Sequence, residues 1–70
     1  MNTFTQDDCQ TYLDVPINGN PQAQLGAPST VTTAALLFGW VQAIADATVR
    51  QHTIDLIKAF IKANGGNPEN

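Results

Sequence analysis

The run VTTAALLFGWVQAIADATVRQHTIDLIKAFIKA, from Val31 to Ala63, decides the fold of this 70-residue chain. It contains the single tryptophan, Trp40, and it has no proline. Apolar residues recur in it at the three- and four-residue spacings of a helix. The sequence therefore predicts an all-α fold whose core comes from this run.

The first half of the run carries two kinds of apolar face. On a helical wheel, its large apolar residues gather on one side: Leu37, Trp40, Val41 and Ile44. Beside them lies a stripe of small residues, each four positions from the last: Ala35, Gly39, Ala43 and Ala47. Small residues on such a ridge let a second helix approach closely. A helix that is apolar around most of its circumference is typically buried.

The second half of the run has its large apolar residues in a different phase: Ile54, Leu56, Ile57, Phe60 and Ile61. Asp55, Lys58 and Lys62 point the other way. On one straight helix the two large apolar faces would lie on opposite sides, which a compact monomer cannot use. The polar segment Arg50 to Thr53 lies at the change of phase, and Thr53 is a candidate N-cap. We expect a helical pair broken there, or one long helix that packs on two neighbours.

The rest of the chain divides around this run into residues 1–29, 30–64 and 65–70. Residues 3–13 predict a short helix, since Thr5 and Asp8 have the spacing of a capping box, and Phe4 and Cys9 that of a hydrophobic staple. Residues 14–29 are rich in proline, glycine and asparagine and predict an irregular, extended arm. The long helical segment should begin near Ser29 or Thr30. It should end at Asn64-Gly65-Gly66, followed by a polar tail.

Composition limits the partners of the chain. Cys9 and His52 are the only residues of their kinds, so we expect neither a disulfide nor a structural metal. The net charge of −3, with three Lys and Arg residues in all, argues against nucleic-acid binding. The polar N-terminus has no signal-peptide pattern, and we expect a cytoplasmic or virion location. A small domain without disulfides or metals commonly relies on a partner subunit.

Candidate chemistry is sparse. His52 could act as a general base with Asp55, although a surface histidine is the simpler interpretation. Cys9 fits a small apolar residue of the staple better than a nucleophile. Asp7, Asp8 and Asp14 lack the spacing of a calcium loop. We expect no catalytic residue, no cofactor and no metal ion.

The sequence predicts a non-enzymatic structural or assembly protein, for instance a minor component of a virus particle. It would associate with itself or with a larger protein assembly, with its arm lying on a neighbour. The predicted interface consists of Ala35, Leu37, Gly39, Trp40, Val41, Ala43, Ile44, Ala47, Ile54, Ile57, Phe60 and Ile61.

Two alternatives remain open. One is a small regulatory or inhibitory protein that binds one partner through the face of Trp40. The other is an accessory subunit of a membrane complex. The membrane alternative is disfavoured, because the stretch from Val31 to Val49 contains Thr32, Thr33, Gln42 and Asp46.

Overall fold

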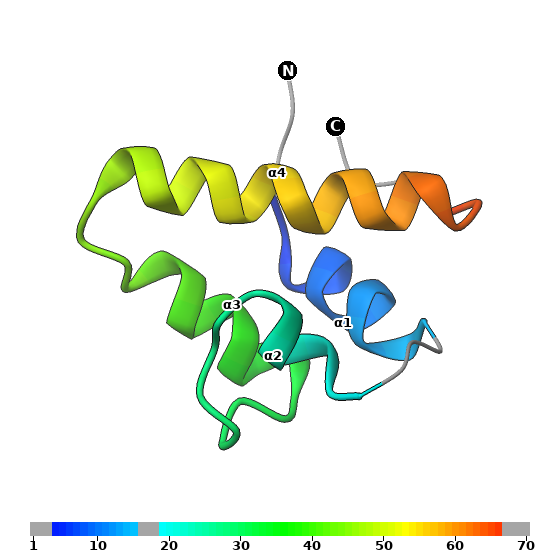
Figure 1. The fold of residues 1–70 in the computed structure, drawn as a ribbon, viewed down its shortest axis with the longest axis horizontal. Helices are drawn as coiled ribbons and strands as arrows, with labels where there is room; N and C mark the ends of the chain where they lie inside the picture. Colours follow the sequence, from blue (N-terminus) through cyan, green and yellow to red (C-terminus); the bar gives the residue numbers. More distant parts are fainter. Residues whose placement is uncertain (1–3, 16–18, 67–70) are drawn as a thin grey trace.

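The computed structural model describes residues 4–15 and 19–66, which form four helices and no strand. The helices are α1 (Gln6–Asp14), α2 (Pro21–Gln24), α3 (Ala34–Gln42) and α4 (Ala47–Ala63). Figure 1 shows α4 along one edge of the molecule. A turn joins the end of α3 to the start of α4, so that the chain reverses direction between the two helices. Helix α1 packs on both α3 and α4, which contact each other less than either contacts α1. The predicted all-α fold is confirmed.

Helix α1 begins with the predicted capping box. The Thr5 hydroxyl accepts from the backbone N–H of Asp8 at 3.3 Å, and the Asp8 carboxylate accepts from the backbone N–H of Thr5 at 3.2 Å. The helix begins at Gln6, three residues later than expected, because Thr5 is its N-cap. Residue 3, where the prediction began, lies outside the described residues. The face formed by Cys9 and Tyr12 is buried.

The predicted extended arm is corrected in its described part, which is folded onto its own chain. Asn20 precedes the short helix α2, and a φ of +78° at Gly26 reverses the chain after it. The Tyr12 hydroxyl donates to the Pro21 carbonyl oxygen at 3.0 Å, and Gln22 and Ala27 are buried. Residues 16–18 of the predicted arm lie outside the described residues. The prediction failed here because the contact from Tyr12 to Pro21 joins residues that local turn chemistry does not connect.

Helix α3 starts later than predicted. Its N-cap is Thr33, whose hydroxyl accepts from the backbone N–H of Leu36 at 3.2 Å. Ser29 and Thr30, the expected caps, instead lie in a turn closed by the bond from Val31 N–H to the Pro28 carbonyl, at 3.0 Å. Val31 is buried, so this turn is anchored to the core before the helix begins.

The predicted break between two helices is present, but it lies at Ala43–Asp46 rather than at Arg50 to Thr53. The Asp46 carboxylate accepts from the N–H groups of Thr48 and Val49, at 2.8 and 3.1 Å, and so caps α4. Thr53, the predicted cap, lies buried inside α4, and its hydroxyl donates to the Val49 carbonyl. A charged cap with two hydrogen bonds starts α4 earlier in the sequence than the polar segment suggested.

The C-terminal end of α4 is as predicted. Gly65 has a φ of +83°, which favours glycine. The N–H of Gly65 donates to the Lys62 carbonyl at 3.2 Å, and the N–H of Gly66 donates to the Ile61 carbonyl at 2.9 Å. These two bonds form a Schellman motif, which satisfies carbonyls that the helix end would otherwise leave without a partner.

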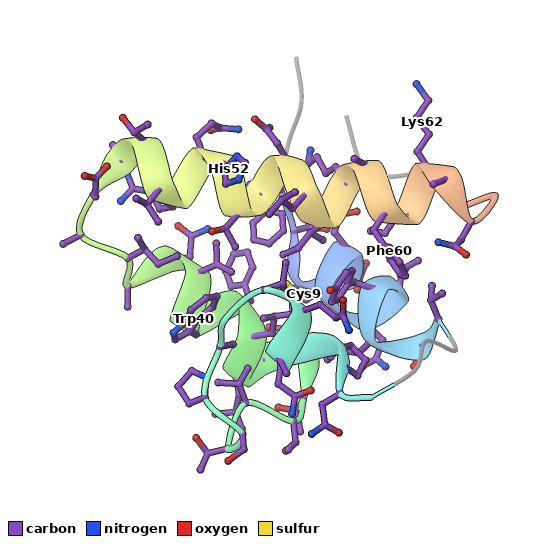
Figure 2. The ribbon with its side chains drawn as sticks, in the orientation of Figure 1. Cys9, Trp40, His52, Phe60 and Lys62 are labelled. Atoms are coloured by element: carbon purple, nitrogen blue, oxygen red, sulfur yellow. The ribbon has the colours of Figure 1, made fainter. Side chains whose placement is uncertain are left out.

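The core collects one face from each long helix around α1. Its buried apolar residues are Cys9, Tyr12, Ala27, Val31, Ala34, Leu37, Val41, Ile57 and Ile61. Two aromatic pairs extend it. The rings of Phe4 and Phe38 stack at 5.5 Å between centroids, and those of Tyr12 and Phe60 meet edge to face at 5.1 Å. Figure 2 shows Cys9 at the centre of the helices, with Phe60 reaching from α4 towards α1.

Lys58 departs from the predicted polar face of α4, because it is buried. It lies on the flank of α4 beside the buried face, four residues after Ile54 and three before Ile61. A lysine stem at such an edge covers apolar surface with its methylene groups. Lys62, by contrast, is exposed, and Figure 2 shows it pointing away from the other helices.

The accessible surface area of the chain is close to that expected of a folded monomer of the same mass. Its accessible surface is 4357 Å². A folded monomer of this mass has roughly 4250 Å². The total area buried is thus that expected of a monomer, and an interface would use surface that the core leaves exposed.

Two adjacent leucines of α3 test this core directly. Leu37 is fully buried and Leu36 is 52% exposed. We expect Leu37→Ala to lower the free energy of unfolding by about 2–5 kcal/mol, through lost burial and a new cavity. Leu36→Ala should change it by less than about 0.5 kcal/mol. Urea unfolding followed by circular dichroism measures both.

A domain of this size is typically stabilised by only about 4–10 kcal/mol, so the loss expected for Leu37→Ala is a large part of the total. Ile57→Val then gives a milder test, with an expected loss of about 0.5–1.5 kcal/mol, since Ile57 is also fully buried. Equal losses for Leu36→Ala and Leu37→Ala would contradict the described orientation of α3.

Candidate interface on the outer face of α3

Helix α3 has an exposed apolar side opposite its buried one. The side that carries Leu37 and Val41 is buried in the core. The opposite side is exposed and has no charged side chain, and we call it the outer α3 face: Ala35, Leu36, Gly39 and Ala43. Within it only Leu36 is large. The face is an uncharged surface of backbone and methyl groups with one exposed leucine, and the exposed Gln42 borders it beside Ala35.

The ridge of small residues on this face is open. Ala35, Gly39 and Ala43 follow one another at four-residue intervals, the row along which helices most often interdigitate. A Cβ added to Gly39 would meet nothing within 4 Å. Gly39 also has no positive φ that would favour glycine. A partner helix could approach the backbone here at the short end of the usual 8–10 Å interaxial distance.

The twelve residues predicted as an interface divide into three groups in the structure. Four are fully buried in their own core and have no accessible surface to offer a partner in this fold: Leu37, Val41, Ile57 and Ile61. Four are half-buried, namely Trp40, Ile44, Ile54 and Phe60, and all of these except Ile44 pack against that core. Four are exposed: Ala35, Gly39, Ala43 and Ala47. The structure brings together only the first three of the exposed group, since the Ala43–Asp46 turn places Ala47 on α4.

Three exposed large apolar residues were not predicted as interface residues. They are Leu36, Val49 and Leu56, at 52, 50 and 44% exposure. Leu36 joins the outer α3 face, and its place on the wheel beside the small stripe was a signal available from the sequence. Leu56 was expected on the buried side of α4, but it lies at the edge of that side.

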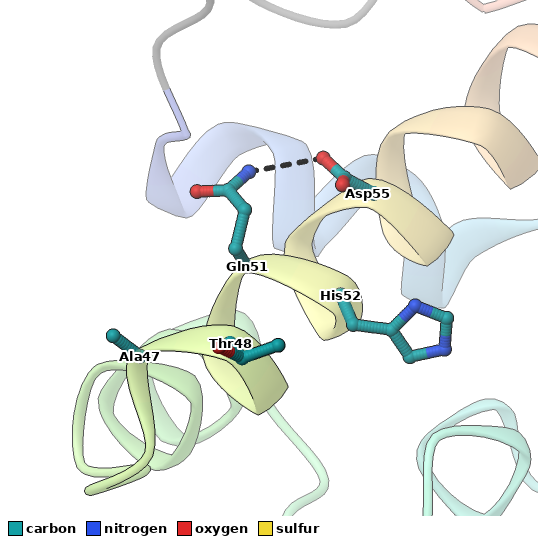
Figure 3. A pocket seen from close by; sticks show the side chains of 5 residues that line it. All are labelled: Ala47, Thr48, Gln51, His52 and Asp55. Atoms are coloured by element: carbon teal, nitrogen blue, oxygen red, sulfur yellow. Dashed lines mark hydrogen bonds between the residues drawn. The ribbon is translucent and has the colours of Figure 1, made fainter.

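A shallow depression on the solvent side of α4 contains the candidate general base. It is lined by residues of this one helix: Ala47, Thr48, Gln51, His52 and Asp55. Asp55 accepts from the Gln51 amide at 3.0 Å. Figure 3 shows the His52 ring pointing away from Asp55. The structure therefore does not form the pair of His52 and Asp55 that a general base would need.

The three acidic residues considered for a metal site do not form one. Across residues 4–15 and 19–66, no three His, Cys, Asp or Glu side chains are grouped so that they could hold a metal ion. Asp8 instead belongs to the capping box, and Asp14 accepts from the Gln10 amide at 2.7 Å. None of the four helices is both long enough and apolar enough to cross a membrane.

The Cys9 thiol is fully buried beside the capping box. Burial raises the pKa of this thiol to about 12, and the nearby Asp8 carboxylate adds to the rise. Only the thiolate is a nucleophile, and at neutral pH this group stays protonated. Burial also raises the pKa of Tyr12. In the folded state Cys9 is thus a small apolar core residue, as the staple pattern predicts.

No protein-family model, curated protein or solved structure matches the chain. The role of the outer α3 face therefore follows from its own residues, their exposure and their chemistry.

The raised pKa of Cys9 predicts a loss of stability in alkali. From about pH 9, the ordinary value of the thiol, to about pH 12, an unfolded chain releases this proton while the folded chain retains it. The free energy of unfolding should therefore be unaffected below this window and fall as the pH rises through it. Urea midpoints at pH 7, 9 and 10.5 measure the fall.

The matched variant is Cys9→Ala, which should be less stable than the wild type at pH 7 but should lose stability less steeply above pH 9. Tyr12 acts in the same direction at higher pH in both proteins, so the difference between the two slopes isolates the thiol. Parallel slopes would show that the thiol is not shielded from solvent.

Proposed function

We propose that this chain is a non-enzymatic assembly protein that associates with copies of itself, or with a larger protein complex, through the outer α3 face. The observation that carries the proposal is Gly39. Glycine inside a helix is about 1 kcal/mol less favourable than alanine. Among the described residues, nothing lies where a Cβ at position 39 would go. Close approach of a second helix gives this glycine a physical role.

The chemistry of the face supports a protein partner. With no charged side chain on it, a second apolar helix can cover the outer α3 face without removing a charge from water. The Leu36 side chain can insert into a groove on a partner helix. The row of small residues leaves a groove on this helix, which a side chain of the partner can fill. Such matching of a projection with a hollow on one surface suits two copies related by a two-fold axis.

The size of the face limits the strength of the association. A nine-residue helix is about 14 Å long. One side of it falls well short of the roughly 800 Å² per partner of a standard stable interface. The proposal therefore implies weak, reversible pairing through α3 alone. Tighter assembly would need neighbouring exposed surface, such as the accessible part of Trp40.

A second candidate is a small regulatory protein that binds one different partner through Trp40. This half-buried residue lies at the border between the core and the outer α3 face. Tryptophan anchored in this way is often central to binding energy. The two candidates differ in solution, since the regulatory protein would remain monomeric by itself at all concentrations.

Gly39→Ala tests the proposal because its two expected effects have opposite signs. The added methyl meets nothing within the chain, so the free energy of unfolding should rise by about 0.5–1 kcal/mol. The same methyl should hinder close approach of a second helix and weaken self-association. Urea unfolding of dilute protein and sedimentation velocity over a range of concentrations measure the two effects separately.

Gly39→Leu should abolish self-association, and Ala59→Leu is its matched control. Ala59 is an exposed residue of α4 outside the outer α3 face, so its enlargement should leave the mass of the assembly unchanged. A well-folded wild-type monomer at every concentration would contradict self-assembly. Equal effects of the two leucine variants would show that the outer α3 face is not the contact.

A further inference from the structure

The turn between α3 and α4 has the composition of a helix. Residues 43–45 are alanine, isoleucine and alanine, and neither glycine nor proline occurs between Ala34 and Ala63 except Gly39. Ala43 still has right-handed helical backbone angles, and its N–H donates to the Gly39 carbonyl at 3.0 Å as in a continuing helix. None of the turn residues has a positive φ. Steric constraints on the backbone therefore do not require this turn.

Local hydrogen bonds hold the turn in place. Asp46 caps α4 through two backbone N–H groups, and the Arg50 guanidinium donates to the Ile44 carbonyl at 2.8 Å. Asp46 is exposed and Arg50 is half-buried. Packing on α1 also favours the turn, because α3 and α4 each contact α1 more extensively than they contact each other.

If the turn became helical, residues 34–63 would form one straight helix with two opposed apolar faces. Leu37 and Val41 would lie on one side, and Ile57 and Ile61 nearly opposite. A single copy of α1 cannot cover both sides of such a helix. Two copies of α1, one from each of two chains, can.

We infer that the Ala43–Asp46 turn is a hinge through which two copies of this chain exchange α4. In the exchanged dimer, α3 stays on the α1 of its own chain, and α4 packs on the α1 of the other. The contacts that α4 makes with α1 and α3 in the monomer form again between chains, the contacts of α1 with α3 stay within each chain, and only the hydrogen bonds of the turn are lost. Exchange of an identical element is a low-cost route to a dimer, and short hinges favour it. This inference does not depend on the outer α3 face.

A distance within one chain tests the exchange. Thr32 and Ala63 are exposed, and in the monomer the turn folds α3 back towards the other end of α4 (Figure 1), so these two ends are closer together than in a straight helix. In the continuous helix the two ends would be about 45 Å apart. Spin labels at Thr32→Cys and Ala63→Cys, with buried Cys9 unlabelled, report this distance by pulsed electron resonance. The labelled chain is refolded from urea at high concentration with excess unlabelled chain, and dimer and monomer are then separated.

We expect a distance of about 45 Å in the dimer fraction and a clearly shorter one in the monomer fraction. Asp46→Ala removes the cap, which acts only in the monomer. Loss of one cap should shift the equilibrium from the turn to the continuous helix about fivefold. Because a dimer contains two hinges, the dissociation constant of the dimer should fall roughly 25-fold. Asp46→Asn is the matched control, because it removes the same charge but keeps a capping oxygen, and it should resemble the wild type.

Ala45→Gly should act in the opposite direction, because glycine disfavours the continuous helix by about fivefold per hinge. This variant keeps the Asp46 cap, so it decides the question even if Asp46→Ala does not fold. A dimer whose labels keep the shorter distance of the monomer fraction would overturn the exchange and leave association through the outer α3 face standing. The absence of dimer in the wild type and in Asp46→Ala would overturn it as well.

Discussion

The reversal of phase between α3 and α4 is the constraint on which the rest of the structure depends. Along one helix, the side chains of Leu37 and Val41 would face away from those of Ile57 and Ile61. The four residues of the Ala43–Asp46 turn bring both faces onto the same neighbour, α1. Helix α1 is only nine residues long, yet its buried Cys9 and Tyr12 lie where the two faces meet. The fold therefore needs both the turn and α1. Without the turn the two apolar faces would point in opposite directions, and without α1 they would have no common helix to pack on.

This arrangement changes the meaning of the apolar surface that remains. The chain exposes about as much surface as a monomer of its mass should, so the outer α3 face is not the result of an unfinished core. It is a separate feature, with an exposed leucine, a ridge of small residues and a glycine that the chain's own packing does not require. A face of this kind lowers stability slightly through Gly39 and adds apolar exposure through Leu36. Both costs are offset if a second helix covers the face.

Local features of the fold were predictable from the sequence, and contacts between distant residues were not. The capping box at Thr5 and the glycine cap at Gly65 depend on neighbouring residues, and both are present. The helix break was expected, but its position was wrong, because a four-residue polar segment outweighed the single aspartate that caps α4. The wheel found the small ridge of the outer α3 face, but it could not tell which large residues the chain would bury itself. Leu37 and Ile61 were therefore predicted for an interface and lie in the core. Leu36, the largest residue of the outer α3 face, was missed although the wheel places it beside the small ridge.

The central claim is that α1 packs on both α3 and α4 of its own chain. Its most direct test is a nuclear Overhauser measurement between aromatic rings, on protein dilute enough to be monomeric. The account predicts two intrachain contacts together: Phe4 with Phe38, which joins the residue before the Thr5 cap of α1 to α3, and Tyr12 with Phe60, which joins α1 to α4. A monomer that shows only one of the two pairs would contradict the account, because α1 would then serve only one of the two helices.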